Sequence, residues 1–231
     1  MKHWGRTVTK VLGIVVLAFV LIQLWFFAHV WWWKTHDPEM TSFMRIRLAE
    51  LRTENPRAQL IHRWADYDAI APSLKRAVVA AEDDHFMSHH GFDWGGIQRA
   101  IERNRARGTT RAGGSTISQQ LAKNLFLSPS RSYLRKGQEA LITVMIEATW
   151  SKRRTLEVYL NVVEWGDGIF GAEAAAWRHY GINAAHLTPT QSARLAVMLP
   201  NPRVYGANFT PRLARHANAV RQRMGYSRIP N

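Results

Sequence analysis

The chain has 231 residues, no cysteine, and 31 Lys plus Arg against 17 Asp plus Glu, which gives a formal net charge of +14. The absence of cysteine excludes a disulfide framework and a thiolate metal site. The basic excess favours an anionic partner, and phospholipid head groups, a pyrophosphate-bearing substrate and nucleic acid all carry such charge. The alternative is that the excess of arginine only reflects the base composition of the genome.

An uncharged apolar run, VLGIVVLAFVLIQLWFFAHVWWW, occupies residues 11–33. At 1.5 Å rise per residue it forms a helix of about 35 Å, enough to cross a hydrocarbon core of about 30 Å. Basic residues in 1–10 favour a cytoplasmic N-terminus, and Trp31–Trp33 suit the opposite interface. We therefore predict a cytoplasmic tail at 1–10 and one transmembrane helix at 11–33.

Two other interpretations of this run are weaker. A secretory signal peptide has an apolar region of about 7 to 15 residues followed by a small-residue cleavage site, and neither feature fits here. An amphipathic surface helix needs a polar face, but only Gln23 and His29 interrupt the apolar residues. An anchored domain that faces outward also disfavours nucleic acid as the partner.

The residues after the anchor are enough for one domain of ordinary size, which we place at 61–231. Residues 34–60 are mixed and polar, and we expect a juxtamembrane segment with one short helix at Ser42–Arg52. The first firm helix is expected at Ser73–Asp83, with Ser73 as its N-cap.

The rest of the chain also predicts helices. The Gly- and Arg-rich stretch 90–114 should hold a short helix and then a mobile loop, GTTRAGG, at 108–114. The helix over 133–150 is apolar nearly all round in LITVMI, so we expect it to be central to the core. No alternating strand pattern is evident, and the predicted fold is mostly α. Further helices are expected at Ser115–Leu127, Tyr133–Trp150, Thr155–Val163, Ala172–His179, Thr188–Leu199 and Pro211–Met224.

Glu82 is unusual for its position. It lies in the last turn of a helix, where the macrodipole disfavours anions, and four residues after Val78 on the stripe expected to be buried. Both effects raise the pKa of a carboxylate, which suits a general base or acid. A salt bridge that ends the helix is the alternative, and a metal site is a weaker one. Titratable side chains crowd after it at Asp83, Asp84, His85, His89 and His90.

Two further clusters follow. In GGSTISQQLAKNL (113–125), glycines and hydroxyls precede a helix that presents Thr116, Gln120 and Lys123 on one face, which suits sugars or phosphates. A capped helix with a polar exposed face is the alternative.

In RKGQE (135–139), Glu139 is expected half-buried at the start of an apolar run. Its basic neighbours favour the ionised carboxylate and suit a leaving phosphate, although Arg135 and Glu139 also form an ordinary i,i+4 pair.

Five segments in order resemble the motifs of the peptidoglycan glycosyltransferases, glycosyltransferase family 51, over residues 65–205. They are EDDHFMSHHG (82–91), GGSTISQQLAKNL (113–125), RKGQE (135–139), RRTLEVYLNVVEWG (153–166) and ARLAVMLPNP (193–202). The resemblance implies a mostly α, lysozyme-like, two-lobed domain behind one N-terminal transmembrane helix, with a head and a membrane-dipping jaw. No transpeptidase domain follows, so we expect a monofunctional member rather than a bifunctional penicillin-binding protein.

The resemblance also implies a mechanism. Glu82 would take the proton from the 4-hydroxyl of the acceptor in lipid II, whose oxygen attacks C1 of the donor with inversion and release of undecaprenyl pyrophosphate. Glu139 would support the departing side. Substrate-binding roles would fall on Asp83, Phe86, His89, Thr116, Gln120, Lys123, Asn124, Arg131, Arg135 and Lys136. A divalent cation, Mg²⁺ or Mn²⁺, at the pyrophosphate stays open, although the sequence supplies no dedicated cage for it.

The expected location is the bacterial inner membrane, with a cytoplasmic N-terminus and a periplasmic catalytic domain. Expected partners are lipid II, the growing glycan strand, membrane lipids and proteins of cell division or elongation. Two rival functions remain: a lytic glycosidase on a similar fold, and a non-catalytic membrane scaffold. The basic cluster disfavours the first, since a hydrolase releases no pyrophosphate.

Overall fold

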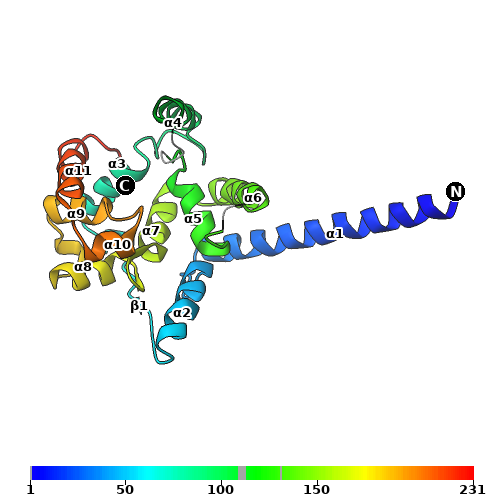
Figure 1. Cartoon of the computed structure of the whole chain (residues 1–231), viewed down its shortest axis with the longest axis horizontal. Helices are drawn as coiled ribbons and strands as arrows, with labels where there is room; N and C mark the ends of the chain where they lie inside the picture. The colour runs from blue at the N-terminus through cyan, green and yellow to red at the C-terminus, as the bar shows by residue number, and fades with distance from the viewer. Residues whose placement is uncertain (1, 109–112, 131) are drawn as a thin grey trace. The chain divides into compact units, whose positions relative to one another are not determined.

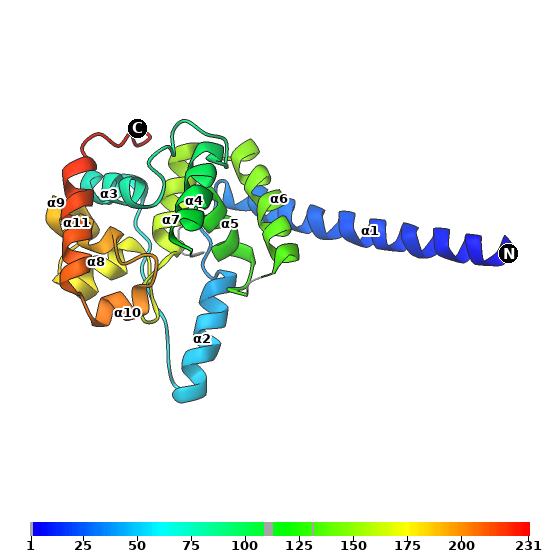
Figure 2. The same ribbon diagram turned by 45° about the horizontal axis from the view of Figure 1, so that its top comes forward.

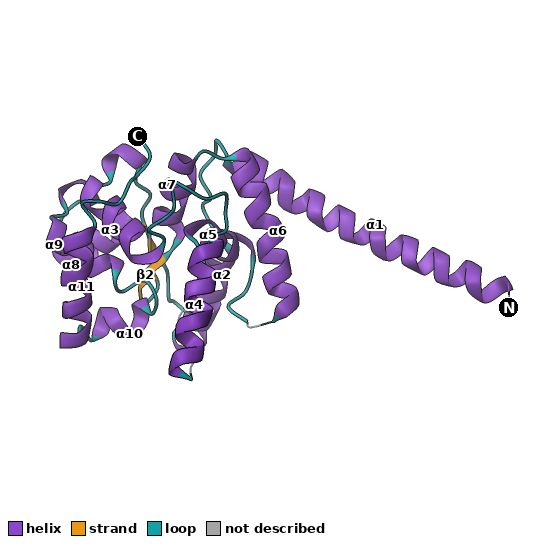
Figure 3. Cartoon of the chain, turned by 90° about the horizontal axis from the view of Figure 1, so that it is seen from above, coloured by secondary structure: helices purple, strands orange, loops and turns teal. Residues whose placement is uncertain are grey.

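The computed structural model describes residues 2–108, 113–130 and 132–231. Helices dominate this part of the chain (Figure 3), which confirms the mostly α prediction. Most of the predicted mobile loop GTTRAGG, residues 109–112, lies outside the described residues, and so does Arg131. The α-helices are α1 (Lys2–Trp33), α2 (Ser42–Glu54), α3 (Pro72–Glu82), α4 (Trp94–Arg107), α5 (Ile117–Phe126), α6 (Tyr133–Thr149), α7 (Lys152–Val162), α8 (Ala172–Tyr180), α9 (Pro189–Ala196), α10 (Pro202–Ala207) and α11 (Pro211–Arg223).

The chain divides into two compact units, Met1–Asp37 and Pro38–Asn231. The first unit consists mainly of α1, in which Thr7–Trp33 is long and apolar enough to cross a membrane. The predicted span 11–33 falls within this helix. An apolar helix of this length fits single-pass anchoring.

The second unit begins with α2, which confirms the short helix expected there. Thr41 is its N-cap, and the Thr41 hydroxyl accepts from the Met44 N–H at 3.2 Å. Since α2 packs on α5, much of the segment predicted as juxtamembrane belongs to this compact unit.

The helices of the second unit form two groups with α7 between them (Figures 1 and 2). In one group α3 packs on α9 and α11, and in the other α5 packs on α6. The central helix α7 also packs on α5 and buries Leu156, Val158, Tyr159 and Leu160 completely. The two ends of the site described below come from α3 in one group and from α5 and α6 in the other.

The prediction that the 133–150 helix is central to the core is wrong. On α6, Ile142 and Ile146 are fully buried, but Leu141 is 41 % exposed and Val144 is 54 % exposed. The physical reason is that α6 packs chiefly on α5, through one face. An apolar helix face left in solvent is typical of a surface that meets a membrane or a partner.

Ser73 is not the N-cap of its helix, contrary to prediction. The helix α3 begins one residue earlier, at Pro72, because proline lacks the N–H that the first turn leaves unpaired and its fixed φ suits that position. The Ser73 hydroxyl instead donates to the Leu187 carbonyl at 2.8 Å and lies 2.8 Å from the Ser192 hydroxyl. Ser73 therefore ties α3 to the start of α9.

A small sheet, which the sequence did not predict, joins β1 (Ile61–His62), β2 (Glu164–Gly166) and β3 (Ile169–Phe170) in the order β1-β3-β2. Strands of two or three residues are too short to show an alternating pattern. Gly171 then has a φ of +89°, and a Cβ there would lie 2.6 Å from the Arg63 carbonyl oxygen. Only glycine fits this start of α8.

Two further differences from prediction concern α9 and α10. The helix α9 begins at the predicted capping box but ends at Ala196 rather than Leu199. The short α10 was not predicted, because Pro200 and Pro202 indicate the end of the preceding helix, whereas Pro202 occupies the first turn of a new helix.

Candidate active site

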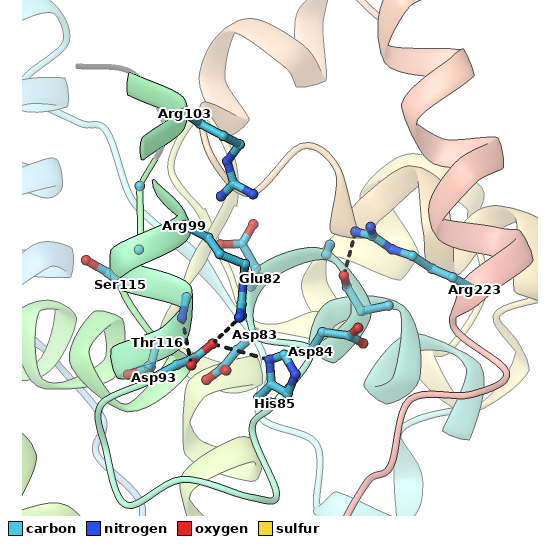
Figure 4. Close-up of a pocket in the computed structure, with 15 residues that line it drawn as sticks. Glu82, Asp83, Asp84, His85, Asp93, Arg99, Arg103, Ser115, Thr116 and Arg223 are labelled. Carbon is cyan, nitrogen blue, oxygen red and sulfur yellow. Dashed lines mark hydrogen bonds and ion pairs between the residues drawn. The ribbon is translucent and has the colours of Figure 1, made fainter. Parts of the chain in front are cut away.

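Glu82 is the last residue of α3, and it lines a cavity of about 470 Å³ (Figure 4). The helix ends there because Asp83 leaves the helical conformation, with φ −159° and ψ 72°, while its N–H still donates to the Val79 carbonyl at 2.9 Å. The Glu82 Oε2 accepts from Gln120 Nε2 at 2.8 Å. Burial raises the pKa of Glu82 and the Asp83 charge adds to this, while Gln120 and Lys123 oppose it. The raised pKa agrees with the sequence prediction and suits proton transfer.

A hydrogen bond from Tyr159 fixes the side chain of Gln120. The Tyr159 hydroxyl donates to Gln120 Oε1 at 3.0 Å, so that the amide nitrogen of Gln120 faces Glu82. Burial, together with the charges of Glu82 and Asp83, raises the pKa of Tyr159 well above its usual value. Tyr159 therefore stays a donor. Asn124 adds a bond from Nδ2 to the Gln120 carbonyl at 2.7 Å.

Asp83 connects the Glu82 end of the site to the start of α5. Its buried carboxylate accepts from the Ile117 N–H at 3.0 Å, where the helix N-terminus favours an anion, and contacts His89 Nε2 at 2.9 Å. His89 Nδ1 accepts from the Gly91 N–H at 3.1 Å, which leaves the proton on Nε2. The Thr116 hydroxyl donates to the Gly91 carbonyl at 2.7 Å. This network fixes the loop between α3 and α4 against the start of α5.

Glu139 is 2 % exposed, and two cations hold its carboxylate. Arg135 Nη1 donates to Oε2 at 2.6 Å, and Lys136 Nζ donates to Oε1. Lys136 Nζ also donates to the Ser115 hydroxyl at 3.2 Å. The expected half-burial of Glu139 is therefore wrong: the carboxylate is enclosed because this face of α6 packs on α5.

Lys123 interacts with both acids. Burial lowers the pKa of Lys123, Glu139 and Glu82 raise it, and Arg135 and Lys136 lower it. The Lys123 Nζ also lies 5.5 Å from the centre of the Phe43 ring. We call Lys123, Arg135, Lys136 and Glu139 the Glu139 cluster.

Three cavities that share lining residues lie between Glu82 and the cations of the Glu139 cluster. The cavity at Glu82 shares Gly114 and Ser115 with a second cavity of about 210 Å³. The second cavity shares Lys136 with a third, of about 350 Å³, which Arg135 also lines. An extended ligand with an anionic group can therefore span from Glu82 to the Glu139 cluster.

The other residues proposed from the motifs support the site from within. Phe86 is fully buried, its ring centre lies 6.4 Å from that of His89, and Lys152 Nζ lies 4.7 Å from its centre. Thr116 caps α5 in a capping box with Gln119. Phe86 and Thr116 are thus positioned to shape the site.

Some residues of the cavity were missed. Arg99 and Arg103 reach from α4 into the cavity beside Glu82, and Arg223 of α11 lines the same cavity (Figure 4). The i,i+4 spacing of the first two was the only sequence signal, and it equally describes a solvated helix face. Tyr159 was interpreted as part of an apolar stripe, and nothing in the sequence singled out its hydroxyl.

The weak alternative of a metal site at the histidines gains no support. Within residues 2–108, 113–130 and 132–231, no three His, Asp or Glu side chains converge. His89 contacts Asp83, whereas His85 Nδ1 lies 3.3 Å from Asp93, so the two histidines face different carboxylates.

A mostly helical domain with a half-buried acid in a cavity, together with a cationic cluster, defines a class of enzyme suited to proton transfer on a substrate that carries an anionic group. A family profile described as "Transglycosylase" matches residues 49–225. The chain is 62 % identical over 230 residues to the biosynthetic peptidoglycan transglycosylase of Azoarcus sp. (strain BH72), and 61 % identical over 230 residues to that of Aromatoleum aromaticum. That of Janthinobacterium sp. (strain Marseille) is 55 % identical, and all three matches cover 100 % of both chains. The chain therefore belongs to the transglycosylase family.

Proposed function

We propose that the protein is a peptidoglycan glycosyltransferase that polymerises lipid II into glycan strands for the cell wall. The family match and the names of the relatives support the reaction class. The observation that carries the mechanism is that the two acids at the ends of this row of cavities, Glu82 and Glu139, have opposite surroundings. Glu82 has a raised pKa and one neutral donor, whereas Glu139 holds two cations.

At the Glu82 end, the base takes the proton of the acceptor. The ionised Glu82 carboxylate removes it from the 4-hydroxyl of the acceptor sugar as that oxygen bonds C1 of the donor. Burial makes this carboxylate a stronger base than an exposed glutamate. Gln120, fixed by Tyr159, keeps the other lone pairs of the carboxylate turned toward the cavity.

At the other end, the bond between C1 and the pyrophosphate oxygen breaks, and the pyrophosphate leaves with the electron pair on the face opposite the attack, which inverts C1. Lys123, Arg135 and Lys136 compensate its charge. Glu139 holds two of these cations in place. The resemblance gives Arg131 a substrate-binding role as well, but Arg131 lies outside the described residues.

Among the described residues, the Glu139 cluster offers a divalent cation at the pyrophosphate no free carboxylate, and the cation stays a prediction. Glu139 is the carboxylate there, and its two oxygens are taken by Arg135 and Lys136. A hard cation needs several oxygen ligands. We therefore derive no step through a metal ion.

The membrane arrangement is part of the proposal. The apolar helix α1 supports a single-pass anchor. The basic residues in 1–10 favour a cytoplasmic N-terminus, which would place the catalytic domain in the periplasm. The exposed apolar face of α6 supports a second contact with the lipid, as the jaw implied by the resemblance would make. Both substrates carry polyprenyl tails, so enzyme and substrates would meet on one membrane. Protein partners in division or elongation stay a prediction.

The decisive test supplies lipid II to the full-length protein in detergent and follows both products. We expect longer glycan and released undecaprenyl pyrophosphate from the wild type, and neither from Glu82→Gln. Shortening of preformed glycan without polymerisation would identify a lytic glycosidase instead. Cells in which Glu82→Gln fully replaces the wild type in glycan synthesis would indicate a scaffold.

A further inference from the structure

The C-terminal segment 223–231 begins with the last residue of α11 and returns to α3. The Ser227 hydroxyl donates to Asp84 Oδ1 at 2.9 Å. At the start of the segment, Arg223 Nη2 donates to the Ala80 carbonyl at 2.7 Å. Near its end, the Tyr67 hydroxyl donates to the Pro230 carbonyl at 2.6 Å. These bonds cross from one end of the domain sequence to the other.

Two of the bonds bracket Glu82, since Ala80 precedes it by two residues and Asp84 follows it by two. The Ala80 carbonyl belongs to the last turn of α3, where carbonyls lack a partner within the helix. A guanidinium satisfies such a carbonyl and also suits the negative end of the helix dipole. The segment 80–84, which we call the Glu82 turn, is therefore held on both sides.

The far end of the segment has a rigid anchor. Tyr67 is buried, Lys75 Nζ lies 3.9 Å from its ring centre, and Arg153 Cζ lies 4.3 Å from it. Burial raises the pKa of Tyr67 to about 12, so its hydroxyl is a donor at neutral pH. Ser227 is buried as well, whereas its neighbour Tyr226 is 89 % exposed.

We propose that the C-terminal segment is a positioning element for the base: through Ser227 and Arg223 it holds the Glu82 turn so that the Glu82 carboxylate stays directed into the cavity. This inference rests on the proposed function, because it needs Glu82 to be the base. The family match ends at residue 225, so Ser227 and Pro230 lie beyond it. Geometry matters here because a displacement of about 1 Å can cost about 100-fold in rate.

The test compares three full-length variants in the lipid II assay. Ser227→Ala removes the bond to Asp84, and we expect kcat to fall about tenfold with KM for lipid II within about twofold of wild type. Ser227→Thr keeps the hydroxyl and should restore most of kcat. Tyr226→Ala changes the exposed neighbour and should match wild type.

Two further measurements separate positioning from general stability. Hydrogen exchange should speed up at amides of 80–84 in Ser227→Ala while the amides of α7 keep wild-type protection. An active Ser227→Ala enzyme with wild-type kcat would overturn the positioning role, as would a loss of kcat that only tracks a lowered melting temperature. If the wild type makes no glycan at all, the proposed function fails, and exchange at 80–84 still decides whether Ser227 holds the turn.

Discussion

Glu82 is half-buried and Glu139 is buried, and the surroundings of the two acids are opposite. Glu82 ends a helix, receives one neutral hydrogen bond from Gln120, and has a raised pKa because burial outweighs its favourable contacts. Glu139 lies inside a helix and receives two charged donors, from Arg135 and Lys136. Burial alone thus does not set the chemistry of a carboxylate; the charges that meet it do.

The difference assigns a task to each acid. A carboxylate whose ionised form is disfavoured gains from taking a proton, so Glu82 is suited to act on a hydroxyl. Glu139 accepts from two cations, so it is suited to hold Arg135 and Lys136 in place. The same substitution should therefore act differently at the two positions.

Glu82→Gln should give the largest loss, at least about 100-fold in the rate of lipid II polymerisation. It should not lower the melting temperature at pH 7. The folded pKa of Glu82 is raised, so its contribution to stability is present at acid pH and is lost as the pH rises through that pKa. The neutral amide avoids that loss, and calorimetry at pH 7 should show an equal or higher melting temperature. A clear drop would contradict this account of Glu82.

Glu139→Gln should reduce polymerisation by about tenfold to 100-fold, less than the change at Glu82, because the basic side chains remain. Its effect on stability should have the opposite sign. Removing the charge leaves Arg135 and Lys136 without their carboxylate, so the melting temperature should fall. An unchanged melting temperature would show that the two ion pairs are not structural.

Tyr159→Phe tests the hydrogen bond that positions Gln120 beside Glu82. The change leaves Gln120 Oε1 without its donor in a buried site, which costs about 1–3 kcal/mol. We expect a fall of about tenfold in kcat, with the protein folded. Tyr226→Phe is a matched control, since Tyr226 is 89 % exposed, and it should leave kcat at the wild-type value.

The smallest effect concerns pH. Because Glu82 must be ionised to act, the rate should fall toward acid pH, and the midpoint should lie above the 4.5 of an ordinary glutamate. Lys123 lowers the pKa of Glu82, so Lys123→Gln should move this midpoint to higher pH as well as reduce the rate. A midpoint that stays in place would show that Lys123 acts only on the other side of the site.

The sequence predicted what local chemistry determines. Glu82 was identified because a carboxylate on a buried stripe at a helix end breaks two rules at once, and its raised pKa has the expected cause. The helices were found because their periodicity and caps are local, as for the Thr188 capping box of α9. The fold class therefore followed from short segments of the chain.

The wrong predictions concern packing and contacts between elements that lie far apart in the sequence. The apolar sequence of α6 does not say that only one face would meet α5, and so the helix was placed too centrally and Glu139 too near the surface. Tyr159 and Ser227 act through residues about 40 and 140 positions away, which no spacing rule reaches. Ser73 was misassigned because the hydroxyl found partners near α9.

The first turn of α6 has a practical consequence. Tyr133 and Leu134 are 98 % and 88 % exposed, and the next two residues, Arg135 and Lys136, hold Glu139. One turn thus places apolar side chains next to cationic ones, which suits an amphiphile with an apolar tail and an anionic head group. Cutting away α1 should therefore not yield a freely soluble enzyme: the trimmed protein should still partition into micelles through this turn.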